Sequence, residues 1–188
     1  MKYHFIGEEM AYNGDQLSNH WIYKNFGILG DSIVSFVGPC HVDRDMMVDL
    51  EDVLNDDFIY SKKMLHFIVE IFGISLKEGV LVQRLFSAII EDRINHTLGE
   101  TVLKRRGDDL FFNETQKLSV SICTASPTSI LIHTGLNVDP EGAPVEAAGL
   151  VSDLDMENVS SLAFTCMKTL AEEWEDIQMC CCKVRAVV

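Results

Sequence analysis

Residues 104–122 read KRRGDDLFFNETQKLSVSI, in which a basic run and two polar turns separate short apolar pieces. The strand-like segments in and around this stretch are Val102–Arg106, Leu110–Asn113, Lys117–Ala125 and Ser129–Val138. Segments of this kind, separated by short turns, are typical of an antiparallel meander. We therefore expect four successive strands, with Lys117 on a strand directly behind an acidic hairpin.

Three helices are predicted from apolar residues spaced three and four positions apart. The first, Ser61–Phe72, carries an apolar stripe of Met64, Leu65, Ile68, Ile71 and Phe72. The second begins with Ser75-Leu76-Lys77-Glu78, a capping box in which the serine and the glutamate each satisfy a free amide hydrogen, and it runs toward Gly99. Its expected buried face consists of Leu81, Leu85, Ala88 and Ile89. The third helix spans Ala163–Ile177.

Strands are also expected toward both ends of the chain. The turn signal Asn13-Gly14-Asp15 predicts a hairpin between Tyr3–Ile6 and His20–Phe26. Residues 32–37 read as a strand that stops before Pro39, because proline cannot donate to a central ladder. A final short strand is expected at Lys183–Val188.

Strands and helices occur in runs along the chain and do not alternate strictly. This order predicts an α+β fold, an antiparallel sheet with helices packed on one face and a ligand on the other. At 188 residues and 47% hydrophobic content, the chain is long enough for one well-packed core. We therefore expect a single domain over residues 1–188.

The composition of the chain indicates which kinds of binding partner to expect. The formal charge of −14 opposes nonspecific nucleic-acid binding, which needs a basic field, so a small-molecule ligand is expected. Uncharged apolar runs stay far below the roughly 20 residues that span a bilayer, so no membrane segment is predicted. The first residues turn acidic at once and lack an apolar signal region, which predicts a cytoplasmic protein. A homodimer is left open.

Six cysteines are present, Cys40, Cys123, Cys166, Cys180, Cys181 and Cys182. Without a secretory signal we expect reduced thiols that act as small buried hydrophobes, and no metal site. The three adjacent cysteines suit zinc poorly, because neighbours on a strand point to opposite faces. The alternative is a thiol or metal protein built around Cys180–Cys182.

The segment Arg105–Leu110 followed by Lys117–Ile122 resembles the central motif of biotin and lipoate protein ligases. In those enzymes a basic residue, a turn ending in Asp-Leu, a hairpin and a lysine segment lie across the active site. The resemblance implies the fold shared with the catalytic domain of class II aminoacyl-tRNA synthetases. It also implies that Lys117 contacts the carboxylate and α-phosphate of an acyl-adenylate, that Asp109 orients the turn or a ligand amide, and that ATP with Mg²⁺ is the cofactor.

Over nearly its full length the chain resembles the prokaryotic family called domain of unknown function 366. The shared strings include Gly-Asp-Ser-Ile-Val at 30–34, Met-Val-Asp-Leu-Glu-Asp at 47–52 and Cys-Lys-Val-Arg at 182–185. This resemblance implies no particular activity. Residues 47–52 themselves read either as an acidic loop or as carboxylate ligands for Mg²⁺.

The first functional hypothesis is a ligase-like or transferase-like domain that binds a nucleotide or an acyl-adenylate, with Lys117 as the catalytic residue. Its supporting residues are Arg105, Arg106, Asp108, Asp109, Ser119, Ser121 and His133. In a regular strand Ser119 and Ser121 share the face of Lys117, and His133 titrates near neutral pH. The alternative is a non-catalytic small-molecule or partner-binding module on the same fold. It is suggested because no Gly-Arg-Gly loop, which closes over the adenylate in the ligases, precedes the first long strand.

Overall fold

A five-stranded sheet in the order β1-β2-β3-β8-β7 forms the centre of the computed structural model, which describes residues 1–55 and 58–187. Its strands are β1 (Lys2–Phe5), β2 (Ser32–Val42), β3 (Ile59–Phe72), β7 (Ser119–Ala125) and β8 (Ser129–Asp139). Neighbouring strands run antiparallel except β1, which pairs with β2 in parallel. The predicted α+β class is confirmed.

A smaller three-stranded sheet lies beside the β7 edge and consists of β4 (Leu103–Arg106), β5 (Asp109–Phe112) and β6 (Gln116–Lys117). The predicted meander is confirmed, but its third strand is divided at Leu118. The Leu118 amide donates to the Leu110 carbonyl at 2.8 Å, and the Leu118 carbonyl accepts from the Asn137 amide at 2.9 Å. The chain therefore passes from the small sheet to the large sheet at this buried leucine.

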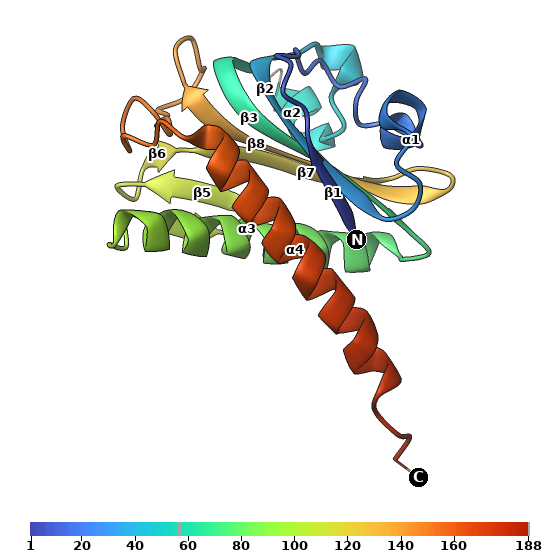
Figure 1. The fold of residues 1–188 in the computed structure, drawn as a ribbon. Coiled ribbons are helices and arrows are strands. Elements are labelled where there is room, and N and C mark those ends of the chain that lie inside the picture. Colours follow the sequence, from blue (N-terminus) through green and yellow to red (C-terminus); the bar gives the residue numbers. More distant parts are fainter. Residues whose placement is uncertain (56–57, 188) are drawn as a thin grey trace.

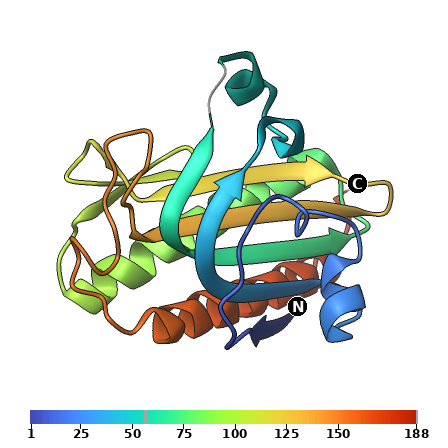
Figure 2. The ribbon, with the colours of Figure 1, turned by 90° about the horizontal axis from the view of Figure 1, so that it is seen from above.

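The two long helices, α3 (Leu76–Leu98) and α4 (Val159–Cys182), cover one face of the large sheet (Figures 1 and 2). The capping box of α3 is confirmed, since the Ser75 hydroxyl accepts from the Glu78 amide and the Glu78 carboxylate accepts from the Ser75 amide. The helix ends at Gly99, whose positive φ of 74° suits glycine. None of the described helices is both long and apolar enough to cross a membrane.

The buried face of α3 differs from the predicted one. Of the predicted face, Ile89 is buried but Leu81 is 61% exposed, and Val82, Phe86, Ile90 and Ile94 are buried instead. The rotation follows from Gly79, where a Cβ would lie 2.4 Å from the Ile130 side chain on β8. Because only glycine permits this close approach, the helix turns the face that contains Gly79 toward the sheet.

The predicted helix at Ser61–Phe72 is wrong, because these residues belong to β3, the central strand of the sheet. Alternate residues Leu65, Phe67, Val69 and Ile71 face the two long helices, and Met64, His66 and Ile68 face the opposite side. Both faces are buried. A strand buried on both faces reads as a nearly continuous apolar run, which also fits a helical stripe.

The predicted N-terminal hairpin is also wrong. His20–Phe26 lies largely in the short helix α1 (Trp21–Phe26), and β1 pairs with β2. The strand expected to stop before Pro39 continues to Val42, with a bulge between Gly38 and Cys40 that accommodates the proline. At the C-terminus, residues 183–187 form no strand, and the last residue of that prediction, 188, lies outside the described residues.

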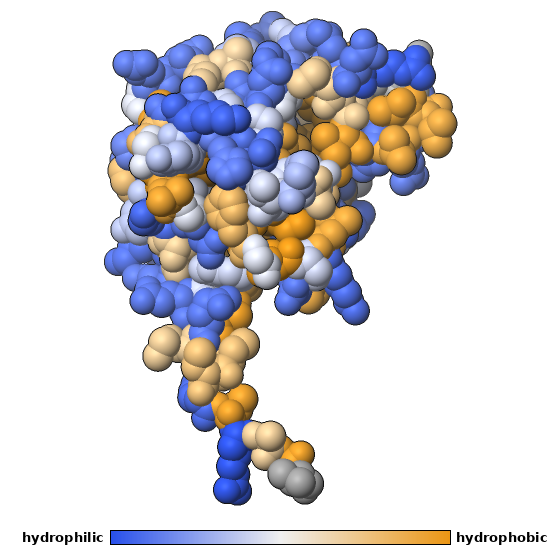
Figure 3. Space-filling view, turned by 90° about the vertical axis from the view of Figure 1, so that its right-hand side faces the viewer, coloured by the Kyte–Doolittle hydropathy of each residue, from blue (hydrophilic) through white to orange (hydrophobic). Residues whose placement is uncertain are grey.

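The second face of the large sheet is covered only in part. Residues 6–28, including α1, pack over β2 and β3 and bury Tyr12, Ile22, Phe36 and Met64 together. The short helices η1 (Arg44–Met46) and α2 (Leu50–Asn55) follow β2 and project from the body, and Figure 3 shows apolar residues exposed there. The part of this face nearest β7 and β8 is not covered, and it borders a cavity.

Truncating Phe86 tests the observed orientation of α3. Phe86 is fully buried and its ring meets that of Phe67 edge-on, with centroids 5.1 Å apart. We expect Phe86→Ala to lower the free energy of unfolding by about 3–5 kcal/mol, and the matched change Leu81→Ala on the same helix to cost less than about 0.5 kcal/mol. Urea denaturation followed by circular dichroism measures both. A larger cost at Leu81 than at Phe86 would contradict this orientation.

Candidate functional site

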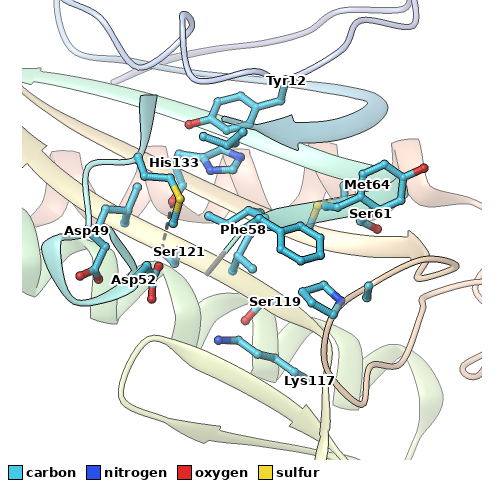
Figure 4. Close-up of a pocket in the computed structure, with 18 of the residues that line it drawn as sticks. Tyr12, Asp49, Asp52, Phe58, Ser61, Met64, Lys117, Ser119, Ser121 and His133 are labelled. Atoms are coloured by element: carbon cyan, nitrogen blue, oxygen red, sulfur yellow. Dashed lines mark hydrogen bonds between the residues drawn. The ribbon is translucent and has the colours of Figure 1, made fainter. Parts of the chain in front are cut away.

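A cavity of about 420 Å³ lies on the sheet face opposite α3 and α4 (Figure 4). Its lining comes from strands β7 and β8, from residues within 42–52 and 58–64, from the hairpin β5–β6 with the neighbouring loop 143–147, and from Tyr12 and Leu17. The meander predicted from sequence therefore supplies one wall, and segments far away in the chain supply the others.

The inner wall of the cavity is apolar. Its main side chains are Tyr12, Val42, Ile59, Met64 and Val120, and Phe58, which is 54% exposed, also lines the cavity. Val42, Met64 and Val120 pack in the hydrophobic cluster on this side of the sheet. A wall of this kind suits the carbon skeleton of a small ligand.

Lys117 lies at the polar end of the cavity, where its ammonium is 3.0 Å from the Asp109 carboxylate. Both side chains are about one-third exposed, 32% and 30%. The lysine backbone is held on two sides, since β6 pairs with β5 and the Lys117 amide donates to the Glu146 carbonyl at 2.9 Å. The lysine is therefore presented by ordered backbone, and its charge is accessible.

Asp108 also borders the cavity, but α3 holds its carboxylate. Arg84 lies 3.0 Å from one carboxylate oxygen, and the Gln83 side-chain amide donates to the other at 2.9 Å. Gly107 has a φ of +69°, and a Cβ there would lie 2.2 Å from the Arg84 guanidinium. These contacts give Asp108 and Arg84 the role of fastening the hairpin turn to the helix.

Arg105 and Arg106 point to opposite faces of β4, and neither is among the described residues that line the cavity. The Arg105 amide donates to Glu91 on α3. Arg106 pairs with Asp109 across the strands and lies 5.1 Å from the centre of the Phe111 ring, on the face that also carries Lys117. Of the two arginines, only Arg106 is on the side from which a ligand at Lys117 is approached.

Ser119 and Ser121 border the cavity, but their hydroxyl groups are turned toward α3 and the hairpin. The Ser119 hydroxyl accepts from the Leu110 amide at 2.9 Å. The Ser121 hydroxyl accepts from Gln83 at 3.0 Å and donates to the His133 carbonyl at 3.1 Å. The expectation that both share the face of Lys117 is wrong, because the strand is divided at Leu118.

His133 lies in the inner wall under the Tyr12 ring and is 3% exposed (Figure 4). The two rings stack with centroids 3.7 Å apart. The Nε2 atom of His133 is 3.1 Å from Nδ1 of His66, whose own Nε2 is 3.2 Å from the Gly38 carbonyl. Burial lowers the pKa of His66 to about 3 and holds the pKa of His133 well below its usual value. Both rings are therefore neutral at physiological pH.

No metal centre is formed within residues 1–55 and 58–187, where no group of three His, Cys, Asp or Glu side chains converges. Asp49 and Asp52 line the outer part of the cavity. The expectation that all six cysteines are buried holds for Cys40 and Cys166 and is wrong for the others, since Cys123 and Cys180 are partly exposed and Cys181 and Cys182 are exposed. Cys180–Cys182 lie at the protruding C-terminal end of α4 (Figure 1).

The sequence did not indicate His66, which contacts His133 behind the cavity wall, or the lining residues Tyr12 and Phe58. His66 was hidden by the incorrect helix prediction, although the alternation of Leu65, Phe67, Val69 and Ile71 is a signal for a strand. Tyr12 and Phe58 come from irregular segments with no chemical motif. They reach the cavity only through tertiary packing.

Comparison with known proteins identifies the family of this chain and a solved structure that is similar to it. The family model described as "Domain of unknown function (DUF366)" matches residues 1–185. A solved protein of unknown function from Pyrococcus horikoshi is 38% identical, with a TM-score of 0.92 over 100% of this chain and 99% of that one.

More distant solved structures share the fold. Biotin protein ligase from Aquifex aeolicus in complex with biotin and ATP has a TM-score of 0.56 at 13% identity, over 91% of this chain and 69% of that one. Lipoate-protein ligase A bound with ATP has a TM-score of 0.54 at 12% identity, over 93% and 86%. The fold predicted from the hairpin resemblance is confirmed.

The two buried histidines predict acid sensitivity. Their pKa values are lower in the folded than in the unfolded chain, so below about pH 6.5 the unfolded state binds more protons and stability falls as pH falls. Each histidine contributes up to about 1.4 kcal/mol per pH unit to the slope of the unfolding free energy against pH. We expect His133→Phe to reduce the slope between about pH 6 and pH 5 by nearly that amount. Urea titrations measure it, and the exposed control His96→Gln should leave the slope almost unchanged. An unaltered slope in His133→Phe would contradict the neutral pair.

Proposed function

The chain belongs to the family described as domain of unknown function 366, and we propose that it binds a small carboxylic acid, or the acyl-adenylate formed from one, in this cavity. Lys117 contacts the carboxylate or the phosphate, and the carbon skeleton lies against the apolar wall. The observation that carries the proposal is an accessible ammonium at one end of an apolar cavity.

The pairing of Lys117 with Asp109 is compatible with this role. An ion pair between partly exposed groups contributes about 1 kcal/mol or less, so a ligand anion competes with it at little cost. The ammonium also has three hydrogens and can hold Asp109 and a ligand oxygen together. Asp109 then serves to aim the lysine at the cavity.

The fold likeness supports the same reading. The two ligases compared above were solved with biotin and ATP, and with ATP. Identities of 12–13% establish the fold and leave the ligand of this chain to be argued from its own residues. Here those residues provide the ammonium of Lys117 and an apolar wall, which together suit a carboxylic acid with an apolar body.

ATP would bind in this cavity as its magnesium complex. Four carboxylates, those of Asp49, Asp52, Asp108 and Asp109, line the cavity beside one lysine, so a bare polyphosphate is repelled. Lys117 and Arg106 would hold phosphate oxygens, and Asp49 and Asp52 would face the metal. When bound, ATP would supply the adenylyl group that activates the carboxylate. The ammonium of Lys117 would stabilise negative charge on the reacting oxygens, and the apolar wall would exclude water.

The second candidate is a non-catalytic binding module on the same fold. It is favoured by the position of Arg105, which is not among the described residues that line the cavity and whose guanidinium donates to the Gly107 carbonyl. It is favoured too by the fastening of Asp108 to Arg84 and Gln83, which leaves fewer groups at the site for nucleotide chemistry. The two candidates differ in turnover, not in where a ligand binds.

Thermal unfolding tests ligand binding. We expect octanoate, lipoate, biotin or Mg-ATP to raise the melting temperature of the wild type, because a ligand at about 100 times its Kd stabilises the folded state by about 2.7 kcal/mol. Lys117→Ala should abolish the shift. Lys168→Ala on α4, which removes another ion-paired lysine, is the matched control and should retain it. Equal shifts in wild type and Lys117→Ala would exclude Lys117 as the contact.

Isotope exchange between ATP and pyrophosphate separates the enzyme from the module. If a bound acid is adenylated, labelled pyrophosphate enters ATP only when the acid and Mg²⁺ are both present. We expect Lys117→Ala to lower this exchange by at least about 100-fold, the scale seen when a charge-stabilising donor is removed. Binding of an acid without any exchange in the wild type would favour the non-catalytic module.

A further inference from the structure

A buried series of contacts, which the proposed role of Lys117 does not use, links the Gly38 carbonyl, His66, His133 and Tyr12. This series of contacts begins at Gly38, next to the bulge in β2. A Cβ at Gly38 would lie 2.0 Å from the Met10 carbonyl, so glycine is needed for residues 10–12 to run along this strand. The Tyr12 amide donates to the Pro39 carbonyl at 2.9 Å, which places the Tyr12 ring over His133.

The Gly38 carbonyl determines where the proton of His66 lies. A carbonyl oxygen only accepts, so Nε2 of His66, 3.2 Å away, carries hydrogen. His66 is fully buried and neutral, and its Nδ1 therefore has a free lone pair. That lone pair accepts a hydrogen bond from Nε2 of His133 at 3.1 Å.

The same logic fixes the proton of His133. Its Nε2 carries hydrogen and the ring is neutral, so its Nδ1 is an acceptor. No donor to this atom is found in the described part of the protein. Tyr12 covers one ring face, and Ile68 and Ile122 are its cross-strand neighbours on the same face of the sheet. The cavity is where a donor can approach.

We propose that His133 Nδ1 selects ligands with a neutral N–H or O–H donor at the end remote from Lys117. In Figure 4 His133 lies beneath Tyr12 in the upper part of the group of lining residues, and Lys117 lies at its lower edge. A ligand that covers this acceptor without supplying a donor leaves it unpaired, so a ligand with an N–H or O–H there binds more tightly than an isostere without one. A carboxylate or phosphate is repelled from this lone pair. The cavity therefore orients its ligand, with the anion at Lys117 and an amide, urea or hydroxyl group at His133.

This inference deepens the proposed function, and its test does not depend on Lys117. The probes are two neutral lactams without a carboxylate, 2-piperidone, which has an N–H, and N-methyl-2-piperidone, which lacks it. Titration is followed by two-bond ¹H–¹⁵N correlations of the protein labelled with ¹⁵N-histidine. In the free protein we expect both His66 and His133 to carry the proton on Nε2. Protonation of His133 at Nδ1 would overturn the proposal.

On titration, 2-piperidone should shift the His133 Nδ1 resonance and bind at least fivefold more tightly than its N-methyl analogue, in the wild type and in Lys117→Ala alike. His133→Phe should bind the two lactams equally, and His96→Gln should keep the preference. No response to 2-piperidone, or an equal response to both lactams, would refute the proposal. A failure of Lys117→Ala to alter binding of acids would instead refute the proposed function and leave this preference intact.

Discussion

The central strand β3 must bury both of its faces, and the arrangement of the molecule depends on that constraint. Its side chains Leu65, Phe67, Val69 and Ile71 need the two long helices, while Met64 and Ile68 need the cover of residues 6–28 on the other side. A sheet covered on both faces has little room for a ligand. The cavity forms where the second cover stops short of β7 and β8, so the site is a consequence of incomplete covering of one face.

Polar groups on this covered face have to be satisfied by one another. His66 is surrounded by Phe36 and Tyr12, and its two ring nitrogens meet the Gly38 carbonyl and His133. Protonation of either histidine is unfavourable, because within the described residues neither ring is hydrogen-bonded to an anion that would compensate the charge. The neutral inner end contrasts with the charged outer end at Lys117 and Asp109, and this difference in polarity distinguishes the cavity from an ordinary packing defect.

Local signals predicted the elements in which neighbours in the chain decide the structure. The capping box at Ser75 and Glu78 located α3, and the turns around Gly107 located the hairpin that presents Lys117. Predictions failed where both faces of an element are buried or where a segment pairs with a distant one. Residues 61–72 were assigned to a helix for the first reason, and His20–Phe26 to a hairpin strand for the second. The faces predicted for Ser119 and Ser121 are wrong because the chain passes from the small sheet to the large sheet at Leu118.

The sequence by itself determined the α+β class, the meander, the capped helix and the placement of Lys117 behind an acidic turn, since turns, caps and short-range alternation act between residues close in the chain. Only the tertiary structure decided the rotation of α3, the pairing of Asp108 with Arg84 and the meeting of His66 with His133, 67 residues apart. These depend on close approaches at Gly79, Gly107 and Gly38. A glycine in the sequence shows that such an approach is allowed, and the packed chain alone shows which partner makes it.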